Sequence, residues 1–260
     1  MKINIKIIAA FLCFFIMSDL FVSAQTEERI VMGQTPVYMV SKTTEPVIID
    51  GRMNESSWNN AEICSFDYFF RLRGNLEKQK TKFRMLWDDK NLYLFYQCED
   101  TSLTARETKR DGIPHIDDCV EFFCVPVADS IYFHYGFEVN LYKAAFDFIV
   151  LWKYYNDNTI FISGYNPEYS VGVTYDGTIN DDTDKDKGWQ MEMQIPFTCF
   201  NEFYRFAPAK PGVRWAFQAV RQDRNLVSDR FRSTSLLFPV FDLRQDVHQP
   251  CHFGLLEFAE

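Results

Sequence analysis

Residues 81–98 have the sequence TKFRMLWDDKNLYLFYQC, in which two apolar-rich runs flank a polar tetrapeptide. In the first run polar and apolar residues alternate, which places Phe83, Met85 and Trp87 on one face of a strand. The tetrapeptide DDKN at 88–91 is typical of a turn, because Asp and Asn hydrogen-bond their own backbone. The stretch therefore predicts a β-hairpin whose returning strand covers residues 92–98.

Further runs of the same kind follow along the chain, separated by Gly, Pro, Asn and Asp residues. We expect strands at residues 119–125, 132–141, 145–152, 169–175, 189–195, 215–221 and 254–258. Helical periodicity is scarce, and only residues 54–58 and 197–203 predict short helical turns. Many short strands at such spacing indicate an all-β protein, an antiparallel β-sandwich of the jelly-roll-like kind.

The first 24 residues differ in character from the rest of the chain. Lys2 and Lys6 precede an apolar run over residues 7–17, and the small residues Ser23 and Ala24 follow. This pattern is typical of a signal peptide, and the apolar run is short for a membrane span. We expect cleavage near Ala24 and a protein exported to the periplasm, the cell surface or the medium. A buried N-terminal helix is the alternative interpretation, and no later stretch is apolar enough to cross a membrane.

Residues 25–260 have a size compatible with one domain, and they contain no internal repeat or low-complexity linker. A hydrophobic content of 47% with 26 Phe residues is ample for a sizeable core. Beyond the signal peptide the chain has six cysteines, which an oxidising compartment would allow to pair. Their spacing does not select a pairing, and buried free thiols remain the other possibility.

The formal net charge of −9, without any basic run, argues against nucleic acid as a partner. The acidic segment at residues 180–188 superficially resembles a calcium loop. It lacks the ligand register and terminal glutamate of an EF-hand, so we interpret it as an exposed hairpin loop.

Five motifs occur in a fixed order over nearly the whole of residues 25–260. They are IIDGRMNESSW at 48–58, LWDDKNLYL at 86–94, RD at 110–111 followed by DDCVEFF at 117–123, GWQMEMQIPF at 188–197, and HQPCHFG at 248–254. Together they resemble the family 9 carbohydrate-binding modules. The resemblance implies a non-catalytic β-sandwich that binds an oligo- or polysaccharide and works beside glycan-degrading enzymes. It also allows structural calcium, although the sequence contains no convincing ligand set.

Most of the motif residues have structural explanations. Asp50-Gly51 suits a tight turn, since glycine tolerates positive φ. The four tryptophans of the apolar alternations are expected to pack in the core rather than against sugar. These are Trp58, Trp87, Trp189 and Trp215.

A sugar site needs an aromatic wall and fixed polar groups. In the best-understood family members two tryptophans sandwich a terminal sugar. The first position aligns here with His115 and the second with Val247 or its neighbour, so both tryptophans are missing. The resemblance places polar sugar contacts at Glu121 and Gln218. Asp118 and His248, which lie in the motifs at 117–123 and 248–254, are further candidate contacts.

A family arginine aligns with Glu138, which reverses the charge at that position. We expect Arg221 to replace the missing cation and to pair with Glu138. The alternative for Glu121 and Arg221 is an ion pair with a structural role. Another aromatic wall is available where residues 145–152 end in a polar loop, and we hypothesise that Trp152 and Tyr154 provide it.

Three other functions remain open. A glycoside hydrolase needs two carboxylates about 5–9 Å apart. Asp118 and Glu121 have an odd separation and would point to opposite faces of a strand, whereas Glu121 and Glu138 are a possible pair. Haem binding between Met and a histidine such as His134 is a second alternative, although no Cys-x-x-Cys-His attachment motif is present. The third is a protein-interaction module that has lost its sugar site.

Overall fold

The computed structural model describes residues 35–71, 78–130, 132–155, 158–202, 207–228, 232–240 and 246–260. The signal peptide expected at residues 1–24 lies outside these ranges, so export stays a prediction. Within the ranges, no helix is both long enough and apolar enough to span a bilayer.

The described residues form fourteen strands and four short 3₁₀ turns. The strands of the first half are β1 (Val37–Lys42), β2 (Cys64–Ser65), β3 (Tyr68–Arg71), β4 (Thr81–Trp87), β5 (Asn91–Glu99), β6 (Cys119–Val125) and β7 (Phe133–Asn140). Those of the second half are β8 (Ala145–Tyr155), β9 (Asn158–Ile162), β10 (Ser170–Asp176), β11 (Gly188–Pro196), β12 (Arg214–Asp223), β13 (Ser233–Leu236) and β14 (Gly254–Phe258). The 3₁₀ turns are η1 (Ser56–Asn59), η2 (Pro114–Ile116), η3 (Phe197–Phe200) and η4 (Pro250–His252).

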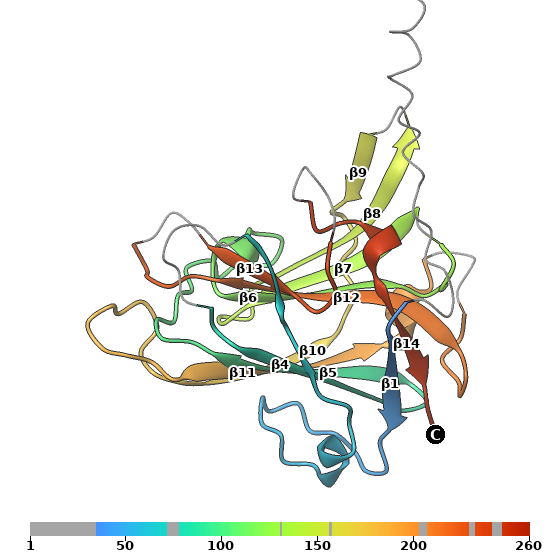
Figure 1. The fold of residues 1–260 in the computed structure, drawn as a ribbon, viewed down its shortest axis with the longest axis horizontal. Coiled ribbons are helices and arrows are strands. Elements are labelled where there is room, and N and C mark those ends of the chain that lie inside the picture. Colours follow the sequence, from blue (N-terminus) through green and yellow to red (C-terminus); the bar gives the residue numbers. More distant parts are fainter. Residues whose placement is uncertain are drawn as a thin grey trace, which may run out of the picture.

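The strands form one curled sheet that folds into two layers (Figure 1). Strands β10, β11, β5 and β4 make one layer, and β12, β6, β7 and β8 belong to the other, with β1 and β14 joining them. This confirms the predicted sandwich. The sheet is mixed rather than strictly antiparallel, because β1 runs parallel to both β14 and β4. No hairpin signal precedes or follows β1, and its parallel pairing is a long-range contact that the sequence pattern did not predict.

The core lies between the two layers and is rich in aromatic residues. Phe83 of β4 packs on Phe217 of β12, with ring centroids 6.4 Å apart. All four tryptophans named above are buried, as predicted. Two of the buried indoles satisfy their N–H groups on backbone carbonyls, Trp87 on Ala259 and Trp215 on Ala207.

The layer of β12, β6, β7 and β8 also carries apolar side chains on its outer face. Side chains alternate along a strand, so Trp215 and Phe217 of β12 face the core, while Ala216 and Val220 face outward. The outer side chains pack with Phe253 and other residues of the C-terminal segment. The outer face of this layer is therefore partly covered, and it forms the floor of a pocket described below.

Two predicted loops, the turn at residues 50–51 and the acidic loop at 180–188, hydrogen-bond to other parts of the chain. In the Asp50-Gly51 turn, Gly51 has φ +78°, and both backbone N–H groups donate to the carboxylate of Glu192, 3.1 Å away. The acidic segment at 180–188 belongs to the hairpin loop between β10 and β11, and most of its residues are exposed, as predicted. Asp186 is an exception: it is buried, and its carboxylate accepts hydrogen bonds from the backbone N–H groups of Leu103 and Thr178.

The cysteines of the described residues include several free thiols. Cys64, Cys98, Cys119, Cys124 and Cys199 are unpaired. Burial raises the pKa of these thiols, to about 12 for Cys98, so they act as small apolar core groups.

Candidate functional site

A pocket of about 270 Å³ opens on the outer face of the β6–β7–β8–β12 layer. Its floor consists of side chains from neighbouring strands, and its walls come from η2, β9 and the segment before η4. The lining residues are His115, Glu121, Glu138, Phe146, Phe161, Gln222, Arg232, Thr234, Asp246, Val247 and His248.

Two glutamates occupy the centre of the floor. Glu121 of β6 and Glu138 of β7 are direct partners in the antiparallel register, so their side chains project from the same face. They are 2% and 5% exposed. Gln222 Nε2 donates to Glu121 Oε1 at 2.7 Å, and His115 Nδ1 lies 3.1 Å from Glu138 Oε2. Burial raises the pKa of both carboxyls to about 8, and the charge of Glu138 adds to the rise at Glu121.

An aromatic and imidazole wall stands beside these carboxyls. Phe161 meets the ring of His248 edge to face, with centroids 5.2 Å apart. His248 Nδ1 lies 3.1 Å from His134 Nε2, beneath the pocket. Burial lowers the pKa of His248 to about 4 and that of His134 well below its ordinary value, so both rings are neutral at pH 7. The pocket thus combines fixed hydrogen-bonding groups with flat apolar rings.

Comparison with known proteins identifies the family. A family model described as "Carbohydrate family 9 binding domain-like" matches residues 49–230, well over half of the chain. The chain belongs to this family. A sequence search of curated proteins found no match.

Solved structures agree with family 9 in fold. A family 9 carbohydrate-binding module from Caldicellulosiruptor kristjanssonii, in complex with cellotriose, has a TM-score of 0.58 at 19% identity, over 86% of this chain and 94% of that chain. The same organism's module in complex with glucose has a TM-score of 0.58 at 16% identity, covering 86% and 95%. A candidate carbohydrate-binding protein from Bacteroides uniformis has a TM-score of 0.64 at 21% identity, covering 86% and 99%. At these identities the likeness shows the shared sandwich.

The two positions that we expect to correspond to the tryptophans of other family 9 members meet in this pocket. His115 lies on η2 and Val247 on the segment before η4, and both line it. Glu121, Glu138 and His248, predicted on the same basis, line it as well. The fold therefore brings five of the expected positions to one pocket.

Sequence reasoning missed the other lining residues. Phe146 was visible in the alternation of β8, whose outer positions also include Phe148 and Val150. Phe161, Arg232 and Asp246 come from segments without a clear strand signal. Trp152 and Tyr154, the hypothesised replacement wall, have side chains outside the described part of the chain, so that hypothesis stays a prediction.

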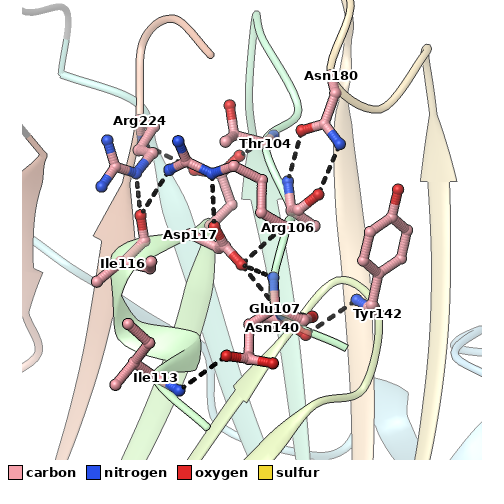
Figure 2. A network of polar contacts seen from close by, with 12 residues as sticks. Thr104, Arg106, Glu107, Ile113, Ile116, Asp117, Asn140, Tyr142, Asn180 and Arg224 are labelled. Atoms are coloured by element: carbon pink, nitrogen blue, oxygen red, sulfur yellow. Dashed lines mark hydrogen bonds and ion pairs between the residues drawn. The ribbon is translucent and has the colours of Figure 1, made fainter. Parts of the chain in front are cut away.

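Asp117 positions the turn that carries His115 (Figure 2). Its buried carboxylate accepts hydrogen bonds from the backbone N–H groups of Arg106 and Glu107, both 2.8 Å away, and from Asn140 Nδ2 at 3.0 Å. The turn is also held by Arg224, whose Nε donates to the carbonyl of Ile116. These contacts fix η2 against the sheet and therefore fix the wall that His115 provides.

We expect Asp117→Asn to lower the free energy of unfolding by roughly 2–4 kcal/mol, because buried donors lose a charged acceptor and meet an amide N–H₂ instead. Urea unfolding followed by fluorescence measures this change. Asp89→Asn is the matched control, since Asp89 makes only an exposed ion pair with Lys42 and its loss should leave the midpoint unchanged. Equal midpoints for both variants would contradict the structural role of Asp117.

Three predicted site residues lie elsewhere. Asp118 is buried, and its oxygens accept backbone N–H groups of Thr104 and Arg224 at 2.6 and 2.7 Å. Gln218 shares the outer face with Glu121, but its amide is fully engaged with the backbone N–H and carbonyl of Phe238. Neither residue lines the pocket.

Arg221 corrects our prediction most clearly, because it faces the core rather than the pocket. Its Nη2 donates to Asp100 Oδ2 at 2.9 Å and to Asp223 Oδ1 at 2.7 Å, and the side chain is fully buried. The expected pairs of Arg221 with Glu138 or with Glu121 do not form. The reason is alternation: Val220, not Arg221, is the register partner of Glu121, so Arg221 projects to the opposite face.

The carboxyl groups around Arg221 are the cluster of the described residues that could be considered for a metal ion such as calcium. Asp100, Asp118 and Asp223 offer carboxylate oxygens within 4.8 Å of one another. All their oxygens already accept hydrogen bonds, from Arg221, Trp189, Ser233 and backbone N–H groups. Calcium requires six to eight oxygen ligands, so this set does not fit it, and the guanidinium of Arg221 serves as the counter-ion instead.

Proposed function

We propose that this family 9 domain binds a carbohydrate in the pocket above Glu121 and Glu138, without cleaving it. The observation that carries the proposal is the convergence of His115 and Val247 with Glu121 and Glu138 in one pocket. The Caldicellulosiruptor relatives of the same fold hold cellotriose and glucose, which supports a saccharide as the ligand class here.

The chemistry of the pocket suits a sugar ring. Phe146 and Phe161 offer apolar surface to the C–H face of a pyranose, and the surrounding polar groups offer hydrogen bonds to its hydroxyls. The carboxyls accept hydrogen bonds when ionised, while Arg232 and Gln222 supply N–H donors. Binding is then an equilibrium event in which shape and hydrogen bonding select the ligand.

The carboxylate geometry favours binding over hydrolysis. A glycoside hydrolase places its two carboxyl groups on either side of the scissile bond. Glu121 and Glu138 are neighbours on one sheet face, so they approach a bound sugar from the same side. His134, considered above as a haem ligand, has its Nε2 within hydrogen-bond distance of Nδ1 of His248, so that nitrogen already has a partner.

The cellular setting is part of the proposal. The N-terminal pattern of residues 1–24 supports export, and family 9 membership supports a role beside extracellular glycan-degrading enzymes. We propose that residues 25–260 form the functional domain in the periplasm or at the cell surface. A protein-interaction module is the function to consider if the pocket binds no saccharide.

Calorimetric titration of the purified protein with glucose, xylose, cellotriose and a wider glycan panel tests the proposal. We expect saturable binding, and we expect Phe161→Ala to weaken it roughly 3–10-fold through loss of ring contact. Ile160→Ala is the control, because Ile160 lies next to Phe161 on β9 but does not line the pocket. No binding of any saccharide, or equal affinities for the wild type and Phe161→Ala, would refute a sugar site in this pocket.

A further inference from the structure

Among the described residues that line the pocket, acidic groups outnumber cations. Three carboxyl groups line it, those of Glu121, Glu138 and Asp246, against the single guanidinium of Arg232. His115, the remaining ionisable ring beside Glu138, has its pKa lowered by burial, and His248 is neutral at pH 7. Acidic groups therefore predominate in the described lining of the pocket. The family resemblance implies an arginine at the position of Glu138, so this chain has the opposite charge there.

The two central glutamates each keep an oxygen free for a ligand. Glu121 uses Oε1 for Gln222, and Glu138 uses Oε2 for His115. Among the described residues, Oε2 of Glu121 and Oε1 of Glu138 have no hydrogen-bond partner, although the two residues are only 2% and 5% exposed. Two unpartnered acceptors on directly opposed residues thus line the same pocket.

Among the described residues, no cation forms an ion pair with Glu121, and Glu138 has only the ring of His115 beside it. Arg232 lies near enough to lower the pKa of both carboxyls, yet burial outweighs its effect. Its Nε donates to the amide oxygen of Gln222 at 2.8 Å, and within the described ranges it forms no ion pair. Neighbouring buried carboxyls without a counter-ion favour any ligand that brings a positive charge with hydrogen-bond donors.

We propose that the pocket is specific for a sugar with a free amino group, a hexosamine or an oligosaccharide of hexosamines, whose ammonium lies between Glu121 and Glu138. This inference rests on the proposed function. The ammonium has three N–H donors, which suit the two free carboxylate oxygens and one further acceptor. Any proton held by the carboxyl pair leaves to solvent as the ammonium binds, so binding releases protons at pH 7.

Other charged ligands fit less well. A uronic acid or a sulfated sugar brings an anion beside three carboxyl groups, so it gains no ion pair with Glu121 or Glu138 and would require both to stay protonated. An N-acetylated sugar has the same ring but no positive charge. A divalent cation would need more ligands than this pair, and among the described residues the only cluster of three carboxyl, imidazole or thiol ligands is that of Asp100, Asp118 and Asp223.

The test is a calorimetric comparison of glucose, glucosamine, N-acetylglucosamine and glucuronate with the full-length protein at pH 7, in two buffers of different ionisation enthalpy and with EDTA present. We expect glucosamine to bind about tenfold more tightly than glucose, as a charged hydrogen-bonded pair provides. We expect N-acetylglucosamine to lose this advantage and glucuronate to bind most weakly. The glucosamine enthalpy should depend on the buffer, which reports proton release.

Glu138→Gln should bring the ratio of glucosamine to glucose affinity close to one, whatever its effect on glucose itself. Glu99→Gln, an exposed change on the other layer, should leave the ratio unchanged. Equal affinities for glucose and glucosamine in the wild type, or tighter binding of N-acetylglucosamine or glucuronate, would overturn the amino-sugar inference and leave carbohydrate binding standing. Absence of binding by every sugar would instead remove the proposed function.

Discussion

Replacing Arg221 with methionine is expected to lower the free energy of unfolding by about 3–5 kcal/mol at pH 7. The guanidinium is the central cation of a fully buried cluster with Asp100 and Asp223, and its Nη1 also donates to Thr81 Oγ1 at 3.1 Å. Methionine fills much of the same volume but leaves these carboxyl groups buried without a counter-ion. Chemical unfolding of the variant and the wild type measures the difference.

The control and the pH dependence separate this effect from a simple loss of packing. Arg214→Met breaks an ion pair with Glu257 that is partly exposed, and it should cost less than about 1 kcal/mol. The penalty of Arg221→Met should shrink as the pH falls toward 4, because the orphaned carboxyls then become protonated. A cost of under 1 kcal/mol at pH 7, or a cost that does not change with pH, would show that the cluster is not held by charge.

Glu138→Gln is expected to stabilise the fold at pH 8 by roughly 2–4 kcal/mol relative to the wild type. In the folded protein burial raises the pKa of Glu138 to about 8, against an ordinary value of 4.5. The positive charge of Arg232 lowers this pKa and the nearby Asp147 raises it, but burial has the largest effect. Between these two values the folded state holds a proton that the unfolded chain has lost. The glutamate therefore destabilises the fold progressively as the pH rises from about 4.5 to 8.

Unfolding at a series of pH values checks the sign of this effect. The gain from Glu138→Gln should be largest at pH 8 and vanish below about pH 4.5, where the glutamate is protonated in both states. Glu99→Gln, on an exposed position, should show no such dependence. If Glu138→Gln were less stable than the wild type at pH 8, Glu138 would be a structural ion-pair partner and not a buried carboxyl kept for binding a ligand.

The two substitutions concern two groups of buried acidic residues, one on each face of the same layer, that differ in whether a cation pairs with them. On the core face of β12, Arg221 compensates the acids, and the cluster supports the fold. On the outer face, Glu121 and Glu138 have no arginine or lysine partner within the described ranges, and the stability that they cost is of the kind that proteins accept at binding sites. A ligand that supplies the missing cation would recover part of that stability on binding.

The placement of site residues shows where sequence reasoning failed. Gln218 and Arg221 are three positions apart on one strand, so alternation alone assigns them to opposite faces, and grouping them in one site was wrong. Glu121 and Glu138 were paired correctly because they lie on consecutive strands of a hairpin. Phe161, Arg232 and Asp246 reach the pocket from segments that carry no periodic signal.

By itself the sequence determined the all-β class, the hairpin of β4 and β5 and the buried tryptophans, because side-chain alternation and turn chemistry are local properties. The family followed from the resemblance of its ordered motifs. Only the tertiary structure decided that β1 pairs in parallel with β14 and β4, and that η2 and the segment before η4 meet over β6 and β7. It also assigned Arg221 to Asp100 and Asp223. Pairings of this kind join residues far apart in the chain, and they depend on the register and curl of the whole sheet, which no local pattern records.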